Sequence, residues 1–171
     1  MVSALAGTMF FFSCTGSFDM YCRQYAVYYT ADITKEPYNY IQSPHQYITV
    51  RRNSRNGTVE TTKPDGSVQT DYQYGSDQYK NFMFGLGGLI IGTPALDQGN
   101  IWCFDLACPI CNSAAARLDI DNVNGKCTCP KCKSAFDLDN SGFVLETSSD
   151  DPRPLFRYPV TLSGTNLIIR N

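Results

Sequence analysis

Two pairs of cysteines place the strongest constraint on how this chain can fold. Each pair has the form Cys-Pro-x-Cys, at Cys108-Pro-Ile-Cys111 and Cys129-Pro-Lys-Cys132, and seventeen residues separate the pairs. A Cys-x2-Cys turn presents two sulfur atoms from one tight loop, and seventeen residues are enough to bring a second such turn opposite the first. The spacing therefore predicts a metal site made by four thiolates, those of Cys108, Cys111, Cys129 and Cys132.

Disulfides or buried free thiols are the alternative for the same four cysteines. Proline after the first cysteine of each pair, and Lys131 beside a thiolate, favour a metal-binding turn. Two kinds of cofactor fit four thiolates. Zn²⁺ is the usual ion between opposed Cys-x2-Cys turns, whereas a single Fe ion or a [2Fe-2S] cluster would carry an electron. We expect Zn and keep iron as the alternative.

The sequence after the second pair resembles the second half of a Rieske domain. The matching positions are Cys129, Ser134, Phe136, Asp137, Gly142 and the run Pro154-Leu-Phe-Arg-Tyr158, and Cys108-Pro109 matches the start of the first cluster loop. The resemblance covers residues 84–171, about half of the chain. It implies an all-β fold with Rieske-like antiparallel sheets or a barrel, in which two metal-binding hairpin loops oppose each other.

The cofactor ligands depart from the Rieske pattern. A Rieske centre needs two histidines on one iron, but Cys132 occupies one histidine position, and Ile110 followed by Cys111 occupies the other. The single histidine, His45, lies in a distant segment. The resemblance thus implies the fold with an altered, four-cysteine site. More narrowly, the chain resembles Rieske-like lipoproteins of the Bacteroidetes type.

The N-terminal segment resembles the signal of a bacterial lipoprotein. Residues 2–12 are apolar or small and uncharged, and Ser13-Cys14 follows them. This stretch is too short to span a bilayer, which takes about 20 apolar residues, but it fits the apolar region of a secretory signal. Phe11 and Phe12 are unusual in a lipobox, and a buried strand is the alternative. We expect a signal and lipobox segment at 1–14, a lipid on Cys14, and a membrane-anchored protein in the bacterial cell envelope, with the outer membrane as its expected location.

Length and charge indicate one medium-sized domain that does not bind nucleic acid. A domain of this size buries about 70% of its unfolded surface, so the core does not depend on the metal. The net charge is −2, with acidic and basic residues mixed along the chain. A nucleic-acid binder would show a basic patch. We expect one Rieske-like β domain at 15–171, with a metal-binding subdomain at about 100–145.

Strands separated by turn sequences account for most of the chain, and no stretch of ten residues has a helical period. Asp71–Asn81 is expected to be a loop, and Arg51, Arg52 and Arg55 are expected to lie at a solvated turn. The expected strands are Tyr25–Ile33, Tyr47–Val50, Thr58–Thr62, Ser67–Thr70, residues 89–92 after a Gly-rich turn, Leu155–Leu162 and Leu167–Arg170.

The sequence contains no convincing catalytic or nucleotide-binding motif. With one histidine, the chain offers no credible nucleophile and base. The Gly85-Leu-Gly-Gly88 turn precedes a strand rather than a phosphate-binding helix. We therefore expect no enzymatic activity. The expected function is an interaction subunit of a membrane assembly, with an unknown protein partner in the envelope and a structural zinc site; electron transfer is the alternative.

Three cysteines remain once Cys14 and the four ligands are assigned. Cys22, Cys103 and Cys127 are an odd number, so at least one should be unpaired. Cys103 and Cys127 lie on strands that lead into the two metal loops. We expect these strands to be neighbours, with the two thiols close together and reduced, and a disulfide between them is the alternative.

Lipidation of Cys14 gives the first testable prediction. A fatty-acid analogue supplied during growth should label the wild-type protein, and Cys14→Ala should lose both the label and membrane association because the acceptor thiol is gone. Cys22→Ala, which removes a different cysteine, should keep both. An unlabelled wild-type protein in the cytosolic fraction would contradict the lipoprotein assignment.

Overall fold

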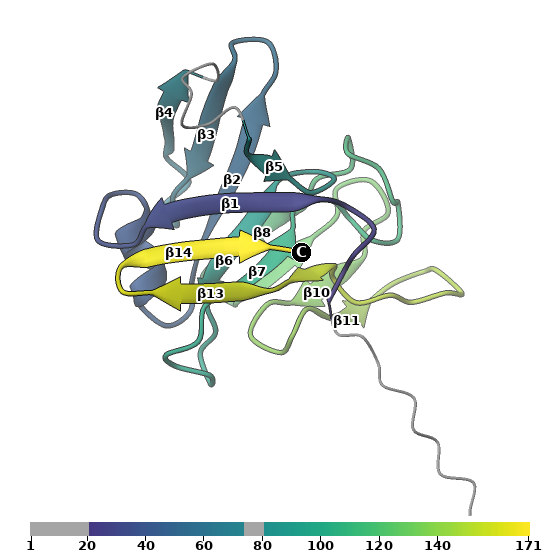
Figure 1. The fold of residues 1–171 in the computed structure, drawn as a ribbon. Helices are drawn as coiled ribbons and strands as arrows, with labels where there is room; N and C mark the ends of the chain where they lie inside the picture. The colour runs from purple at the N-terminus through teal and green to yellow at the C-terminus, as the bar shows by residue number, and fades with distance from the viewer. Residues whose placement is uncertain (1–20, 74–80) are drawn as a thin grey trace, which may run out of the picture.

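The structure is a computed structural model that describes residues 21–73 and 81–171, so the expected signal segment and Cys14 lie outside the described residues. In the described part of the chain, fourteen strands pair into three sheets in which every strand pairing is antiparallel. One five-residue 3-10 helix, η1 (Tyr38–Gln42), accompanies them (Figure 1). No helix in these residues is long and apolar enough to cross a bilayer. The predicted all-β class is confirmed.

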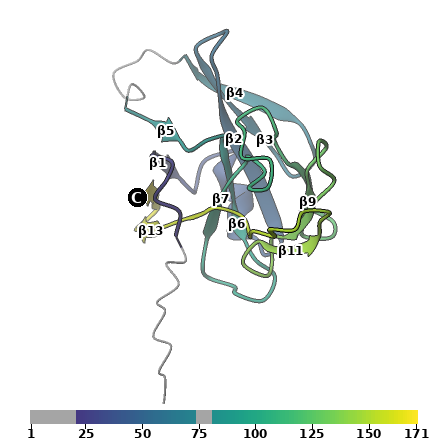
Figure 2. The same ribbon diagram turned by 90° about the vertical axis from the view of Figure 1, so that its right-hand side faces the viewer.

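One large sheet lies between two smaller ones (Figure 2). The six-stranded sheet contains, in spatial order, β12 (Arg157–Tyr158), β7 (Trp102–Asp105), β6 (Leu89–Thr93), β2 (Gln46–Asn53), β3 (Thr58–Thr62) and β4 (Val68–Gln73). One four-stranded sheet contains β13 (Val160–Ser163), β14 (Asn166–Arg170), β1 (Val27–Asp32) and β5 (Met83–Phe84). The other contains β11 (Phe143–Glu146), β10 (Ala135–Asp137), β9 (Lys126–Thr128) and β8 (Asp119–Asp121).

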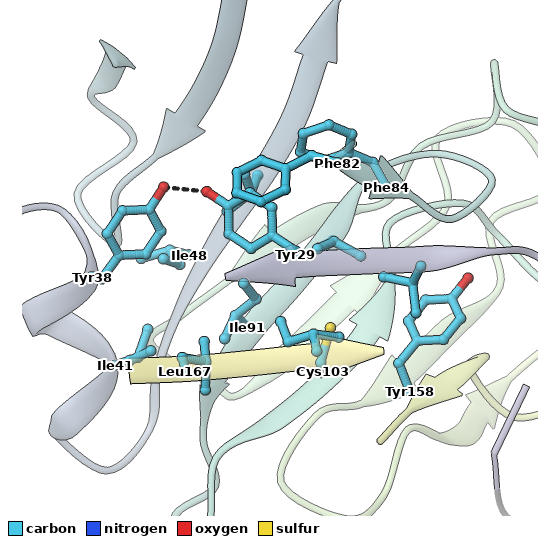
Figure 3. Close-up of a cluster of buried hydrophobic side chains, with 14 of the residues drawn as sticks. Tyr29, Tyr38, Ile41, Ile48, Phe82, Phe84, Ile91, Cys103, Tyr158 and Leu167 are labelled. Carbon is cyan, nitrogen blue, oxygen red and sulfur yellow. Dashed lines mark hydrogen bonds between the residues drawn. The ribbon is translucent and has the colours of Figure 1, made fainter. Parts of the chain in front are cut away.

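Both faces of the six-stranded sheet are covered, so two hydrophobic cores form. Successive side chains of a strand point to opposite faces. On β6, Ile91 belongs to the core shared with β1 and β14, while Ile90 belongs to the core shared with β9 and β10. All five residues of β6 are buried for this reason. Figure 3 shows the first core, with Tyr29 of β1 and Leu167 of β14 beside Ile91.

Most expected strands are present, and the differences have local causes. β3 has the expected ends, and β13 and β14 form the expected closing hairpin. β4 extends to Gln73, so the prediction of a loop at Asp71–Asn81 is wrong for residues 71–73. Residues 74–80 lie outside the described part. The single strand expected at Leu155–Leu162 is divided at Pro159, which has no N–H for a ladder hydrogen bond.

The prediction that Cys103 and Cys127 lie close together on neighbouring strands is wrong. Cys103 is on β7, whose neighbours are β6 and β12, whereas Cys127 is on β9, whose neighbours are β8 and β10. Cys103 packs in the first core and Cys127 in the second, because on β7 it is Trp102 and Phe104 that face the second core. Both cysteines are free thiols, as expected.

A polar cluster connects the β8–β11 sheet to β2. Asp139, in the turn after β10, receives hydrogen bonds from Tyr47 Oη at 2.9 Å and from the Ala95 amide at 2.8 Å, and its second oxygen lies 2.6 Å from His45 Nδ1. The other ring nitrogen of His45 lies 3.1 Å from the Val123 carbonyl oxygen. His45, remote from the cysteines in the sequence, is thus a contact between two sheets.

Removing the Tyr47 hydroxyl should weaken this connection. Burial, with the hydrogen bond to Asp139, raises the pKa of Tyr47 above its usual range, so the phenol stays a donor to a carboxylate. Hydrogen bonds to charged groups contribute about 1.5–3 kcal/mol, and Tyr47→Phe should lower the free energy of unfolding by about that amount in urea denaturation.

Tyr28→Phe is the matched control for Tyr47→Phe. Tyr28 is 37% exposed, so loss of its hydroxyl should change the free energy of unfolding by no more than about 0.5 kcal/mol. Equal stabilities for the two variants would show that the Tyr47–Asp139 bond does not hold the sheets together.

Candidate metal centre

The two Cys-Pro-x-Cys sequences form turns closed by equivalent backbone hydrogen bonds. Loop 1 (residues 106–118) connects β7 to β8, and loop 2 (residues 129–134) connects β9 to β10. In loop 1 the Asn112 amide donates to the Cys108 carbonyl at 2.9 Å, and in loop 2 the Lys133 amide donates to the Cys129 carbonyl at 2.9 Å. Each loop therefore turns both of its sulfur atoms to the same side.

The residue after each pair has a positive φ, 46° for Asn112 and 63° for Lys133. Asparagine tolerates this left-handed conformation because its short side chain bonds locally. Lys133 stands where the Rieske pattern has glycine, the residue that adopts a positive φ without strain. Lys133 thus adopts a backbone conformation that favours glycine.

Loop 1 and loop 2 bring the four predicted ligands together. The Sγ atoms of Cys108, Cys111, Cys129 and Cys132 all lie within 4.8 Å of one another. Across the loops, Cys108 Sγ is 3.6 Å from Cys132 Sγ, and Cys111 Sγ is 3.8 Å from Cys129 Sγ. Four thiolates bound to one ion at 2.3 Å form a tetrahedron with edges of about 3.8 Å. The spacing and the all-sulfur donor set fit one thiophilic ion.

A buried carboxylate, Asp105, positions the start of loop 1. Its oxygens accept hydrogen bonds from the amides of Leu86 (2.6 Å), Gly87 (2.9 Å) and Ala107 (2.7 Å) and from Tyr158 Oη (2.6 Å). Burial raises the pKa of Asp105, and these four donors act against that shift. The carboxylate joins β7, β12 and the Gly-rich turn, three residues before Cys108. The role of Asp105 could not be predicted from the sequence, because its donors come from three separate segments.

The Gly-rich turn, residues 85–88, packs directly against loop 1. A Cβ atom on Gly87 would lie 2.7 Å from the Ala107 amide nitrogen, and one on Gly85 would lie 2.3 Å from the Asp105 carboxylate. Real Cβ atoms do not approach so closely. The glycines at these two positions are therefore required by the contact of this turn with β7 and loop 1.

The thiols of the site differ in exposure and in pKa. Cys108 and Cys129 are buried, whereas Cys111 and Cys132 are partly exposed. Burial raises the pKa of Cys108 well above its usual range and that of Cys111 to about 11. Burial also opposes ionisation of Cys132, but hydrogen bonds from the side chain and backbone of Ser134 and from neighbouring thiols outweigh it and lower that pKa to about 6.

Ser134 is itself held in place. Its Oγ lies 3.2 Å from Cys132 Sγ and 2.8 Å from Thr147 Oγ1, and the residue is fully buried. Loop 2 thus contains a fixed hydroxyl next to one of its two sulfurs. His45 is not part of the sulfur cluster, which agrees with its exclusion as a ligand.

Comparison with known proteins finds similarity among solved structures. No protein-family model matches the chain, and a search of curated proteins found no match. Among solved structures, the chain is similar to the crystal structure of the cyanobacterial plasma membrane Rieske protein PetC3 from Synechocystis PCC 6803, with a TM-score of 0.40 and 20% sequence identity. The similarity covers 68% of this chain and 89% of that chain. The cofactor and function proposed below rest on the geometry of the four-cysteine site.

Cys132 should be the most reactive thiol of the metal-free site. With a pKa of about 6 against about 11, Cys132 is mostly thiolate near neutral pH and Cys111 is mostly thiol. Iodoacetamide should therefore alkylate Cys132 roughly 10- to 100-fold faster than Cys111. The ratio of rates is smaller than the ratio of thiolate fractions because a thiolate of lower pKa is a weaker nucleophile. Peptide mapping of the metal-free protein measures it, and Ser134→Ala should reduce the difference.

The same pKa predicts how the stability of the metal-free protein depends on pH. The folded-state pKa of Cys132 lies below its unfolded value, so ionisation stabilises the fold above the unfolded pKa and this contribution is lost as pH falls toward about 6. A Cys132→Ala variant should lack that part of the pH dependence. An unchanged profile in this variant would show that Cys132 does not titrate in this range.

Proposed function

We propose that this protein is a Rieske-like envelope lipoprotein of the Bacteroidetes type, in which a structural Zn²⁺ ion replaces the iron–sulfur cluster. The observation that carries the proposal is the arrangement of four sulfurs within 4.8 Å of one another, two on each of two opposed turns. Cys108, Cys111, Cys129 and Cys132 would hold the ion. Bound Zn²⁺ supplies no redox chemistry, and its contribution is to fix the protein ligands relative to one another.

The sulfur spacing favours a single ion over a [2Fe-2S] cluster. In such a cluster each iron is held by its own pair of cysteines and inorganic sulfides bridge the irons, so the two cysteine pairs are pushed apart. Here all four sulfurs lie within 4.8 Å of one another, so no division of the four into two pairs leaves the pairs far apart. Across the loops, two sulfur distances are as short as 3.6 and 3.8 Å. A single Fe ion would fit the same tetrahedron and makes electron transfer the second candidate function.

A structural role for the ion agrees with the lack of regular secondary structure in loop 1. Its thirteen residues contain no strand, and one isolated bridge, Ala107 to Arg117, closes its base. Asp105 holds the start of this loop. The tip, residues 108–112, faces loop 2 through the thiolates of Cys108 and Cys111. The ion would therefore replace the secondary structure that loop 1 lacks.

The location and the partner are further parts of the proposal. A lipid on Cys14 would anchor the domain to a membrane of the cell envelope, with the outer membrane as the expected site. The sequence motifs offer no catalytic pair, so we infer a non-enzymatic interaction subunit of a membrane assembly. Cys111 and Cys132, partly exposed at the outside of the centre, are the parts of the site that a protein partner would approach.

Metal analysis of protein purified without oxygen tests the proposal. The wild type should contain one equivalent of Zn and show no visible absorption, and Cys132→Ser should lose the metal and become more sensitive to proteolysis in loops 1 and 2. Cys127→Ser is the matched control, because this buried thiol lies two residues from Cys129 but outside the sulfur cluster. This control should retain the metal.

Three outcomes would contradict parts of the proposal. A coloured protein that contains iron and acid-labile sulfide would show that the site holds an iron–sulfur cluster instead of zinc. A coloured protein with iron and no sulfide would indicate a single Fe ion. Full metal retention in Cys132→Ser would show that the ligand assignment is wrong.

A further inference from the structure

The chain enters the domain through a short N-terminal arm, residues 21–26, which leads into β1 (Figure 1). The arm belongs to no strand, and four of its six residues are exposed, whereas Cys22 and Tyr25 are half-buried. A segment with few buried side chains and no strand pairing opens more easily than the strands of a core. The docked position of the arm therefore depends on particular contacts.

The C-terminal part of the chain holds the backbone of the arm. Asn171 Nδ2 donates to the carbonyls of Cys22 at 2.9 Å and Tyr25 at 2.8 Å, and Asn171 Oδ1 accepts from the Val27 amide at 3.1 Å. The Cys22 amide donates to the Arg157 carbonyl at 2.7 Å. These bonds use the main chain of the arm, so the side chain of Tyr25 can make a contact of its own.

The side chain of Tyr25 connects the arm to loop 1. Its hydroxyl donates to Asn112 Oδ1 at 2.5 Å, and its ring packs edge-on against Phe156, with the ring centroids 5.5 Å apart. The Phe156 carbonyl accepts from the amide of Asp105 at 2.8 Å, and Asp105 holds the start of loop 1. The arm thus contacts the tip of loop 1 directly and its base through Phe156.

Asn112 is the residue of loop 1 whose position the metal-binding turn sets. It follows Cys111 directly, its amide donates to the Cys108 carbonyl at 2.9 Å, and its φ is 46°. An ion bound by Cys108 and Cys111 would restrain this turn, and it would thereby keep the Asn112 side chain within reach of Tyr25. In the other direction, the hydrogen bond from Tyr25 restrains the residue that closes the turn.

We propose that the arm is a strap coupled to the metal centre, so that metal binding and docking of residues 21–26 stabilise each other through the Tyr25–Asn112 hydrogen bond. Such coupling is reciprocal: the factor by which the docked arm raises the affinity for the ion equals the factor by which the ion favours the docked arm. Displacement of the arm weakens the hold on the ion, and loss of the ion loosens the arm. This inference rests on the metal site of the proposed function, but not on the identity of the ion.

Competition for Zn²⁺ between the full chain and a chromophoric chelator tests one direction of the coupling. Tyr25→Phe keeps the ring and removes the hydroxyl, so it should weaken Zn²⁺ binding about three- to tenfold, the effect of one hydrogen bond. Tyr28→Phe, at a residue that is 37% exposed, is the matched control and should change the affinity less than about twofold. Asn112→Gly removes the acceptor and tolerates the positive φ. In that background, Tyr25→Phe should cause little further loss, because the bond is already absent.

Hydrogen exchange measures the other direction. Removal of Zn²⁺ from the wild type should speed exchange of the Cys22 and Val27 amides about three- to tenfold relative to the amides of β3, because these two amides are bonded only while the arm is docked. In Tyr25→Phe, removal of Zn²⁺ should change the exchange of the same amides less than about twofold. β3 is a suitable reference because it pairs with β2 and β4 and belongs to neither metal loop.

Two results would overturn the coupling and leave the metal centre intact. One is a Tyr25→Phe variant that binds Zn²⁺ as tightly as the wild type, with exchange of the arm unaffected by the ion. The other is an equal loss of affinity in Tyr25→Phe and Tyr28→Phe, which would show that the contact with Asn112 has no special role. A wild type that binds neither Zn²⁺ nor iron would reject the proposed function, and this inference with it.

Discussion

The six-stranded sheet is covered on both faces, and the rest of the structure depends on this arrangement. Neighbouring residues of β6 and β7 serve two different cores, as Ile90 and Ile91 do, and β6 is buried along its whole length. The β1–β14 layer closes one face. The other face is closed by the short β8–β11 sheet together with the two cysteine loops, so the candidate metal centre is part of the second core and not an addition to a finished domain (Figure 2).

Loop 1 contains no strand, and one isolated bridge, Ala107 to Arg117, closes its base. Asp105 fixes its base through four donors from three segments, and the Gly-rich turn packs against the same stretch without side chains between them. At the tip, four sulfurs with tetrahedral spacing would perform the corresponding task through an ion. With the proposed ion bound, a buried carboxylate and a metal would hold the two ends of one loop, a task that needs no redox chemistry.

The second layer also has a polar connection to the central sheet at its far end. Asp139 is contacted by His45, Tyr47 and the Ala95 amide. The side chain of Asn122 accepts a hydrogen bond from the Tyr47 amide and donates one to the Tyr47 carbonyl. The layer is therefore fixed by Asp139 at one end and by loops 1 and 2 at the other. Arg117, near the end of loop 1, adds a further contact by donating from Nε to the Gly87 carbonyl of the Gly-rich turn.

The sequence by itself determined the features that depend on residues close together in the chain. The Cys-x2-Cys spacing, the turn glycines, the ends of β3 and the closing β13–β14 hairpin follow from local geometry, which a few consecutive residues specify. The tertiary structure alone decided which distant residues meet. Asp105 gathers donors from three segments, and His45 reaches Asp139 across 94 positions. The same reason separates Cys103 from Cys127: each lies on a strand before a metal loop, but strand pairing and the alternation of side chains place them in different cores.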